Sequence, residues 1–259
     1  MSLFTRISLV TSAVASCVLL GPPALAAQDY VQYETQYLIP LPGQSEDLEE
    51  ALGEHNRRFH NEGAFVAIVR YVVNGPRTGQ LVWIMGPGTW TDWDARPADD
   101  AHDSDWASNV MAHARNGRVE YWRQMDDLST IVDQGDDARP LTRVRFFSVE
   151  NEELWRQTQA QQVEAGRAAG PAANSTTFFD RQFADPDGRN FARVTSHRNW
   201  SELDQGGGGG AGGFQQRMVD YLGPAGYEQY REDREAAGIT ILDEWQQLLP
   251  ELSGAGSGN

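Results

Sequence analysis

The sequence predicts an α+β fold made of two tandem β-α-β-β-α-β repeats, and three observations support this prediction. A short tryptophan motif occurs twice, at residues 90–94 (WTDWD) and at residues 200–204 (WSELD). Each copy ends a strand-like run that follows a glycine turn, at Gly79 or at Gly188. The order of strand-like and helix-like segments is the same around both copies. Because self-similarity of this kind decides the fold, we treat the chain as two equivalent halves.

The first half contains four predicted strands and two predicted helices. Alternating apolar residues predict a strand over Tyr30–Ile39, and apolar residues at helical spacing predict a helix that begins near Ser45 and is closed by Gly63. The remaining predicted elements of this half are a strand over Phe65–Val73, a hairpin turn at Asn74-Gly75, a return strand over Leu81–Gly86, a helix over Trp106–Arg115 and a strand over Val119–Met125.

The second half repeats this order. Asn151 is the predicted cap of a helix that ends near Ala169, and a further helix precedes the last strand. The predicted strands are Arg143–Val149, Thr176–Phe183, Phe191–His197 and Ile239–Trp245. We therefore divide the chain into a first repeat (28–130), a linker (131–140), a second repeat (141–250) and a disordered tail (251–259).

Composition excludes several classes of function. The chain has 259 residues, 40% of them hydrophobic, which is enough for a packed core. Its formal net charge of −16 repels nucleic acid and anionic membranes, so neither is an expected partner. All basic residues are arginine, and the absence of lysine excludes Schiff-base chemistry and the lysine of a phosphate-binding P-loop.

Residues 1–27 have the pattern of a secretory signal peptide. Arg6 precedes an apolar run over Ile7–Leu20, and Ala24-Leu25-Ala26 is a small-x-small cleavage pattern. We expect cleavage after Ala26 or Ala27 and a periplasmic or secreted protein. The alternative is lipidation of Cys17, because residues 14–17 (VASC) resemble a bacterial lipobox. Cys17 is the only cysteine, so cleavage leaves a mature chain without thiols or disulfides.

The β-α-β-β-α-β order is that of the ferredoxin-like unit. Two such units, each with the tryptophan motif after its third strand, resemble the dimeric α/β-barrel superfamily. That group includes antibiotic-biosynthesis-type monooxygenases and, in tandem form, the chlorite dismutase and dye-decolourising peroxidase families. The resemblance covers nearly all of the mature chain. It implies that the halves pack sheet against sheet as an intrachain α/β barrel, and it does not by itself imply a function.

The two halves differ on one face of their third strands. Trp83 and Met85 make this face apolar in the first half, whereas the matching face carries Arg193 and His197 in the second half. The opposite faces, Val82-Ile84 and Ala192-Val194, are apolar in both halves, and we expect them to carry the helices. The sequence thus predicts that the second half turns a polar face towards the interior of the barrel.

Arg145, Arg193 and His197 are therefore the predicted ligand-binding residues. The planar fork of arginine suits a carboxylate or phosphate, and a nearby histidine can add a hydrogen bond or move a proton. The alternative is structural, because these arginines can instead pair with carboxylates of neighbouring strands. The candidate carboxylates are Asp180, Asp243 and Glu244.

No metal site is predicted from the sequence. His55 and His60 are five residues apart and do not share a helical face, so His55 is interpreted as a core histidine. The acidic residues 99–105 are interpreted as a solvated loop, and the glycine-rich Gln205–Gly213 as a flexible loop.

Three functional hypotheses remain open after these observations. The first is a protein that binds a small anionic or aromatic ligand inside the barrel, without a cofactor. The second is an enzyme of the superfamily, either a cofactor-free oxygenase or a haem protein in which His197 is the only candidate axial ligand. The third is an interaction module with a filled barrel. The sequence does not decide whether the protein is an enzyme, or whether it is a monomer or a homodimer.

Overall fold

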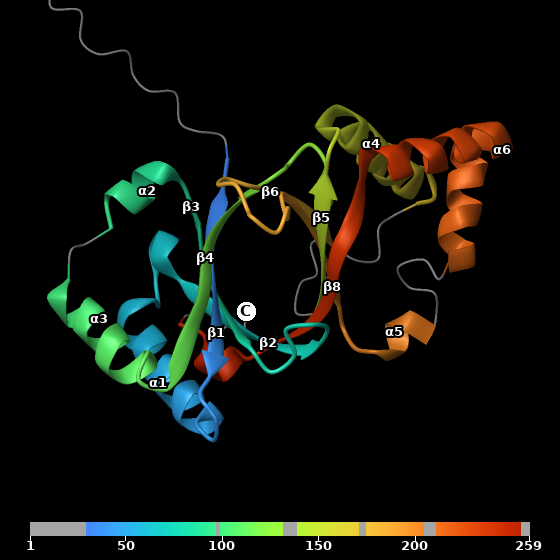
Figure 1. Cartoon of the computed structure of the whole chain (residues 1–259). Coiled ribbons are helices and arrows are strands. Elements are labelled where there is room, and N and C mark those ends of the chain that lie inside the picture. The colour runs from blue at the N-terminus through green and yellow to red at the C-terminus, as the bar shows by residue number, and fades with distance from the viewer. Residues whose placement is uncertain (1–29, 97–98, 132–138, 171–174, 205–210, 255–259) are drawn as a thin grey trace, which may run out of the picture.

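A computed structural model describes residues 30–96, 99–131, 139–170, 175–204 and 211–254. The predicted signal peptide, most of the linker and residues 205–210 of the glycine-rich segment lie outside these ranges. Within the described part, eight antiparallel strands form one sheet that closes into a ring in the order β1-β3-β2-β8-β5-β7-β6-β4 (Figure 1). The strands are β1 (Gln32–Pro40), β2 (Ala67–Asn74), β3 (Leu81–Gly88), β4 (Ala114–Gln124), β5 (Leu141–Val149), β6 (Thr176–Arg181), β7 (Phe191–His197) and β8 (Gly238–Leu248).

The strand order contains two ferredoxin-like sheets joined edge to edge. The first half contributes β4-β1-β3-β2 and the second half β8-β5-β7-β6, so both have the order fourth, first, third, second. The joins are equivalent, because β2 pairs with β8 and β4 pairs with β6. Register agrees as well: Gln36 pairs with Trp83 in the first half, and Arg145 pairs with Arg193 at the same positions of the second half. The predicted fold class of tandem ferredoxin-like repeats is confirmed.

Helices cover the outer face of this ring (Figure 1). Over the first half, Leu48 and Leu52 of the first long helix pack with Trp83 and Met85 of β3. Over the second half, Trp155 packs with aromatic residues of β5, β6 and β7. The helices are α1 (Ser45–Phe59), α2 (Trp90–Asp94), α3 (Asp100–Asp105), α4 (Glu152–Ala168), α5 (Ser201–Asp204) and α6 (Ala211–Ala237), with short helical segments η1 (Gly63–Phe65), η2 (Trp106–Val110) and η3 (Pro250–Leu252). In the described part, no helix is long and apolar enough to cross a membrane.

Several local predictions hold because capping chemistry is local. The Asn151 side chain accepts a hydrogen bond from the Leu154 backbone N–H at 3.1 Å and caps α4 as predicted. In the first tryptophan motif, Thr89 and Asp92 form a reciprocal capping box that begins α2. Trp90 packs against Tyr121 of β4. In the second copy, the corresponding tryptophan packs against Trp245 of β8, which is the equivalent fourth strand.

Several local predictions are wrong. The predicted helix over Trp106–Arg115 begins earlier, as α3, because the Asp99 side chain accepts from the Ala101 backbone N–H at 2.9 Å and caps it. The acidic segment is therefore helical rather than a loop, and β4 starts at Ala114. The loop after Asn74 runs to residue 80 instead of making a two-residue hairpin.

The prediction of a disordered tail is also wrong for the residues just before the C-terminus. Residues 250–254 are ordered rather than part of a disordered tail, because η3 packs on α1. There the Asn56 side chain donates to the Leu252 carbonyl at 2.7 Å, and Leu252 is buried in the core.

The faces of the third strands are also assigned differently from the prediction. Trp122 of β4 packs against Phe146 of β5, with ring centroids 5.5 Å apart, although these strands are not neighbours. Both rings therefore point into the ring of strands. Ala192 and Val194 pack with Phe146, and Val82 and Ile84 lie in the corresponding interior cluster of the first half. The apolar faces expected to carry the helices thus face the interior. Alternation separates the two faces of a strand, but both are covered here, and their polarity does not identify the inner one.

Candidate functional site

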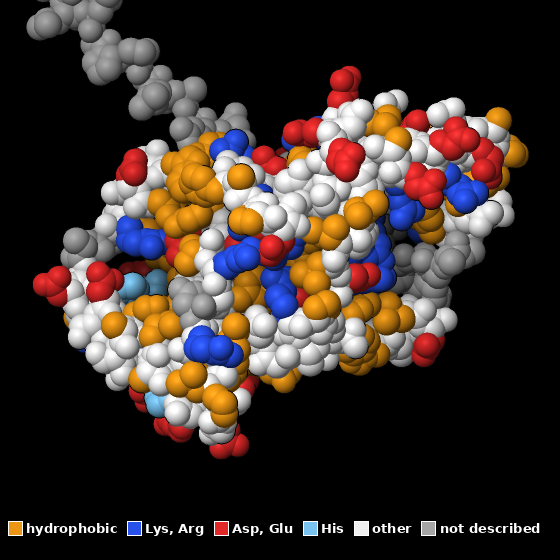
Figure 2. Space-filling view, viewed as in Figure 1, with side chains coloured by type: hydrophobic (Ala, Val, Ile, Leu, Met, Phe, Trp, Pro, Cys, Tyr) orange, Lys and Arg blue, Asp and Glu red, His pale blue; other side chains and the backbone are white. Residues whose placement is uncertain are grey.

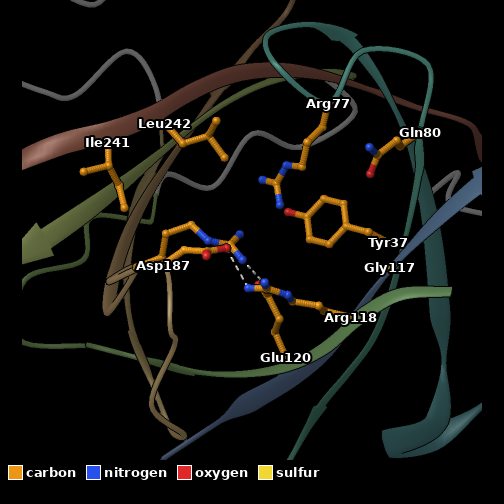
Figure 3. Close-up of a pocket in the computed structure, with 10 residues that line it drawn as sticks. Tyr37, Arg77, Gln80, Gly117, Arg118, Glu120, Asp187, Ile241 and Leu242 are labelled. Carbon is orange, nitrogen blue, oxygen red and sulfur yellow. Dashed lines mark hydrogen bonds and ion pairs between the residues drawn. The ribbon is translucent and has the colours of Figure 1, made fainter.

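The strands and their connecting loops line a pocket of about 450 Å³ that is open to solvent (Figure 3). Its charged side chains pair with one another. Arg77 makes two hydrogen bonds of 2.9 Å to Glu244, and Arg189 donates to Glu120 at 2.8 Å. The other pairs of this network join Arg118 to Asp185 and Asp187, and Arg181 to Asp185. Among the described residues, four arginines thus meet four carboxylates around this pocket, so the charges of the pocket itself are balanced.

Arg145 and Arg193 lie on the other face of the sheet. They are register partners on β5 and β7, so their side chains project side by side. Arg193 Nη1 donates to Oε1 of Gln162 on α4 at 3.1 Å, which places the arginine beneath the helices. The prediction that these residues face the barrel interior is wrong, whereas the prediction that Arg145 and Arg193 lie together is confirmed.

The charges on this face are unbalanced. Arg143 and Arg145 both contact Asp243 of β8, with N–O distances of 2.5 and 3.3 Å. Among the described residues, no carboxylate lies within ion-pair distance of Arg193. Burial, together with the neighbouring charge of Arg145, lowers the pKa of Arg193 to about 9. Arg143 and Arg145 therefore pair with a carboxylate of the neighbouring strand, as the structural alternative expects, but Arg193 does not.

His197 lies farther along the same face. It pairs in register with Leu141, four residues from Arg145 on β5, so it does not adjoin Arg193. Its Nδ1 is 3.5 Å from a Glu202 carboxylate oxygen, and its ring packs on Trp245 at 5.1 Å. Burial lowers the pKa of His197, which favours the neutral ring at neutral pH. The guanidinium of Arg143, 5.6 Å from the Trp245 ring, connects the histidine to the arginine pair.

A second cluster was missed by the sequence analysis. His55 on α1, His60 just after α1 and His102 on α3 each offer a ligand nitrogen, and these nitrogens lie within 4.8 Å of one another. On one straight helix, His55 and His60 would point in different directions, which is why the sequence predicted no shared site. The chain leaves the helix at His60, and the acidic segment expected to be a loop forms α3 and brings His102 against them. These three residues could hold a metal ion.

No family model matches the chain, and no curated protein matches it. Solved structures do. An anthrone oxidase-like protein has a TM-score of 0.58 at 7% identity, covering 85% of this chain and 91% of that one. A monooxygenase-like protein from Lactobacillus acidophilus has a TM-score of 0.51 at 11% identity, covering 89% and 99%.

Chlorite dismutase from Candidatus Nitrospira defluvii gives a similar result. Its complex with imidazole has a TM-score of 0.51 at 8% identity, covering 85% of this chain and 92% of that one. These likenesses confirm the resemblance to the dimeric α/β-barrel superfamily at the level of the fold. They show the fold alone, because identities this low carry neither a function nor site residues across.

Proposed function

We propose that the protein binds a small anionic ligand beneath the helices of its second half, where Arg145 and Arg193 hold the ligand's carboxylate or phosphate group. One observation carries this proposal: of three neighbouring arginines, Arg143 and Arg145 share the carboxylate of Asp243, and Arg193 contacts the Gln162 amide oxygen instead of a carboxylate. Like charges held close together in a partly buried site repel one another. A bound anion would reduce this repulsion and occupy N–H donors that the protein leaves available.

The geometry suits an anion with several oxygens. The Gln162 amide, which itself donates to Gln159 Oε1 at 2.8 Å, holds one edge of the Arg193 guanidinium. The other N–H groups of Arg193 are then oriented beside Arg145. Two adjacent forks of this kind can grip two or three oxygens of one carboxylate or phosphate.

His197 and Trp245 extend the proposed site. Their rings pack on each other at a tilt of 47°, beyond Arg143 on the same face of the sheet. An aromatic part of the ligand can stack there while its anionic group rests on the arginines. In this proposal His197 contacts the ligand without holding its charge.

The test compares two arginine variants of the mature protein, with sodium benzoate and inorganic phosphate as probes. Benzoate or phosphate should raise the Tm of the wild type. Arg193→Met imitates the apolar first half, so it should keep or raise the basal Tm and lose the ligand-induced rise. Arg231→Met is the matched control, because Arg231 lies exposed on α6 and pairs only with Glu228 in the described structure. A collapse of the basal Tm in Arg193→Met would show that the arginine is structural and would refute the site.

Two alternatives have their own tests. The fold neighbours keep open a superfamily enzyme, either a cofactor-free oxygenase or a haem protein with His197 as the axial ligand. An absorption spectrum of protein purified with haem supplied tests the haem hypothesis. The absence of a Soret band would refute it. Native mass spectrometry of protein recovered from its host separates a ligand binder from an interaction module, and it gives the subunit count in the same measurement.

We also propose that the protein is exported. The sequence pattern of residues 1–27 supports this, and the mature chain should begin at Ala27 or Gln28. N-terminal sequencing of the protein from its host checks it. If the chain instead begins at a lipidated Cys17, the protein is anchored to a membrane and is not released in free form.

A further inference from the structure

The histidine cluster of the first half lies apart from the proposed anion site and has a different chemistry. We propose that His55, His60 and His102 bind one divalent transition-metal ion between α1, α3 and the outer face of β3.

The spacing of the nitrogens fits a shared ion. His60 Nε2 and His102 Nε2 are 3.1 Å apart. Two ligand nitrogens of a tetrahedral zinc ion, each about 2.05 Å from the metal, lie about 3.3 Å apart. His55 Nε2 is the third nitrogen: it is fully buried and has no hydrogen-bond partner among the described residues. A buried nitrogen of this kind costs free energy unless something binds it.

The hydrogen bonds determine which nitrogen of each ring is free. His60 Nδ1 lies 2.9 Å from the Phe65 carbonyl oxygen, and His55 Nδ1 lies 2.7 Å from an Asp105 carboxylate oxygen. His102 Nδ1 lies 2.9 Å from an oxygen of the adjacent Asp103. These oxygens only accept hydrogen bonds, so each Nδ1 carries the hydrogen and each Nε2 presents a lone pair. Metal-binding histidines are oriented in this same way by carboxylates and carbonyls.

An empty cluster would be electrostatically unfavourable. With both Nε2 atoms presenting lone pairs, His60 and His102 cannot hydrogen-bond to each other across 3.1 Å, and the two lone pairs repel each other. A dication satisfies all three lone pairs at once without protonating a ring.

The surroundings indicate the class of ion and leave room for a further ligand. Three imidazoles suit zinc, copper, iron or nickel better than calcium or magnesium, which prefer oxygen. Three protein ligands leave a fourth position for water or a small molecule, as in catalytic zinc sites. The His102 side chain is 27% exposed, and histidine side chains reach the surface of the first half beside acidic residues (Figure 2). The ion can therefore enter from solvent.

Cobalt(II) is a suitable probe because its visible absorption reports coordination. The mature protein, purified without a histidine tag, should bind one equivalent of Co²⁺ with the spectrum of a nitrogen- and oxygen-ligated ion. Zn²⁺ should then displace it. His102→Ala removes a partly exposed ligand and should weaken Co²⁺ binding by more than about 100-fold, beyond the range for an outer-shell residue. Asp105→Asn, which disturbs the orientation of His55, should weaken it about 10- to 100-fold.

His113→Ala is the matched control, because His113 lies outside the cluster and its Nδ1 contacts Gln44 at 2.9 Å. This variant should bind Co²⁺ like the wild type. Circular dichroism checks that each variant is folded, and Asp105→Asn tests the site should His102→Ala be unfolded. The proposal fails if the wild type shows no stoichiometric Co²⁺ spectrum, or if folded His102→Ala and Asp105→Asn bind as tightly as His113→Ala. Loss of anion binding in Arg193→Met would leave this outcome unchanged, so the two sites are tested separately.

Discussion

The helix-covered faces of the two halves occupy equivalent places in the fold and differ in chemistry. The third residue of β3 is Trp83, and the third residue of β7 is Arg193. His55 and Gln162 each lie ten residues after the first residue of their helices, α1 and α4. Around Trp83 the first half gathers aromatic rings and histidines, whereas around Arg193 the second half gathers guanidinium groups.

This difference shows how one repeated scaffold can support two kinds of site. Backbone hydrogen bonds fix the register of the strands in the same way in both halves, so the same positions come together beneath the helices. The residues at those positions determine what can bind there. Nitrogen lone pairs converge in the first half, which suits the proposed cation, and N–H donors converge in the second half, which suits the proposed anion.

The largest expected loss of stability comes from removing the Trp83 side chain from the core of the first half. Trp83 is buried, packs against His60 and Trp106, and donates from Nε1 to Asn56 Oδ1 at 2.9 Å. Trp83→Ala should lower the free energy of unfolding by about 3–5 kcal/mol, because it leaves a cavity and an unsatisfied buried amide. Urea denaturation measures this. Phe183→Ala, at a ring that is 59% exposed, should cost far less, and equal losses would contradict the packing described.

A smaller effect is expected from Asp243, the carboxylate that Arg143 and Arg145 share. Burial alone would raise the pKa of Asp243, but hydrogen bonds from Arg143 and Arg145 together with their charges lower it below 3.8. A carboxyl whose pKa is lowered by folding stabilises the protein above its unfolded pKa and loses that contribution as pH falls through its folded pKa. Asp243→Asn should therefore cost about 1 kcal/mol at pH 7, since the side chain is 36% exposed.

The pH dependence sharpens this prediction. The difference in unfolding free energy between wild type and Asp243→Asn should shrink as pH falls from about 5 towards 2. Denaturation at several pH values measures it. A difference that stays constant with pH would show that the carboxylate is not the charge partner of these arginines.

The smallest effect tests the equivalence of the two tryptophan motifs. Trp90 packs between Tyr121 and Phe183, whereas Trp200 is 48% exposed and packs against Trp245 alone among the described rings. Trp200→Ala should therefore lower the Tm less than Trp90→Ala, with a cost of about 1 kcal/mol or less. Thermal unfolding followed by circular dichroism compares them. A larger loss for Trp200→Ala would mean that the exposed motif has a structural role that its packing does not explain.

Some features of this protein were determined by the sequence alone, because their causes are local. Alternating apolar residues and turn residues predicted the strand β7 at its observed bounds, and Asn151 predicted the start of α4. The repeated tryptophan motif predicted the tandem fold, since each copy follows a third strand. The pairing of Arg145 with Arg193 followed from this order, because first and third strands are neighbours in such a sheet.

Other features were decided only by the tertiary structure. Both faces of the sheet are covered, so the alternation of side chains could not show that Arg193 faces the helices and Val194 the interior. Asp243 was one of three candidate partners until β8 was seen to lie beside β5. His60 and His102 are 42 residues apart in the sequence, and they meet only because α3 folds back onto the end of α1. Contacts between distant segments depend on how whole elements pack, and no local pattern of residues records that arrangement.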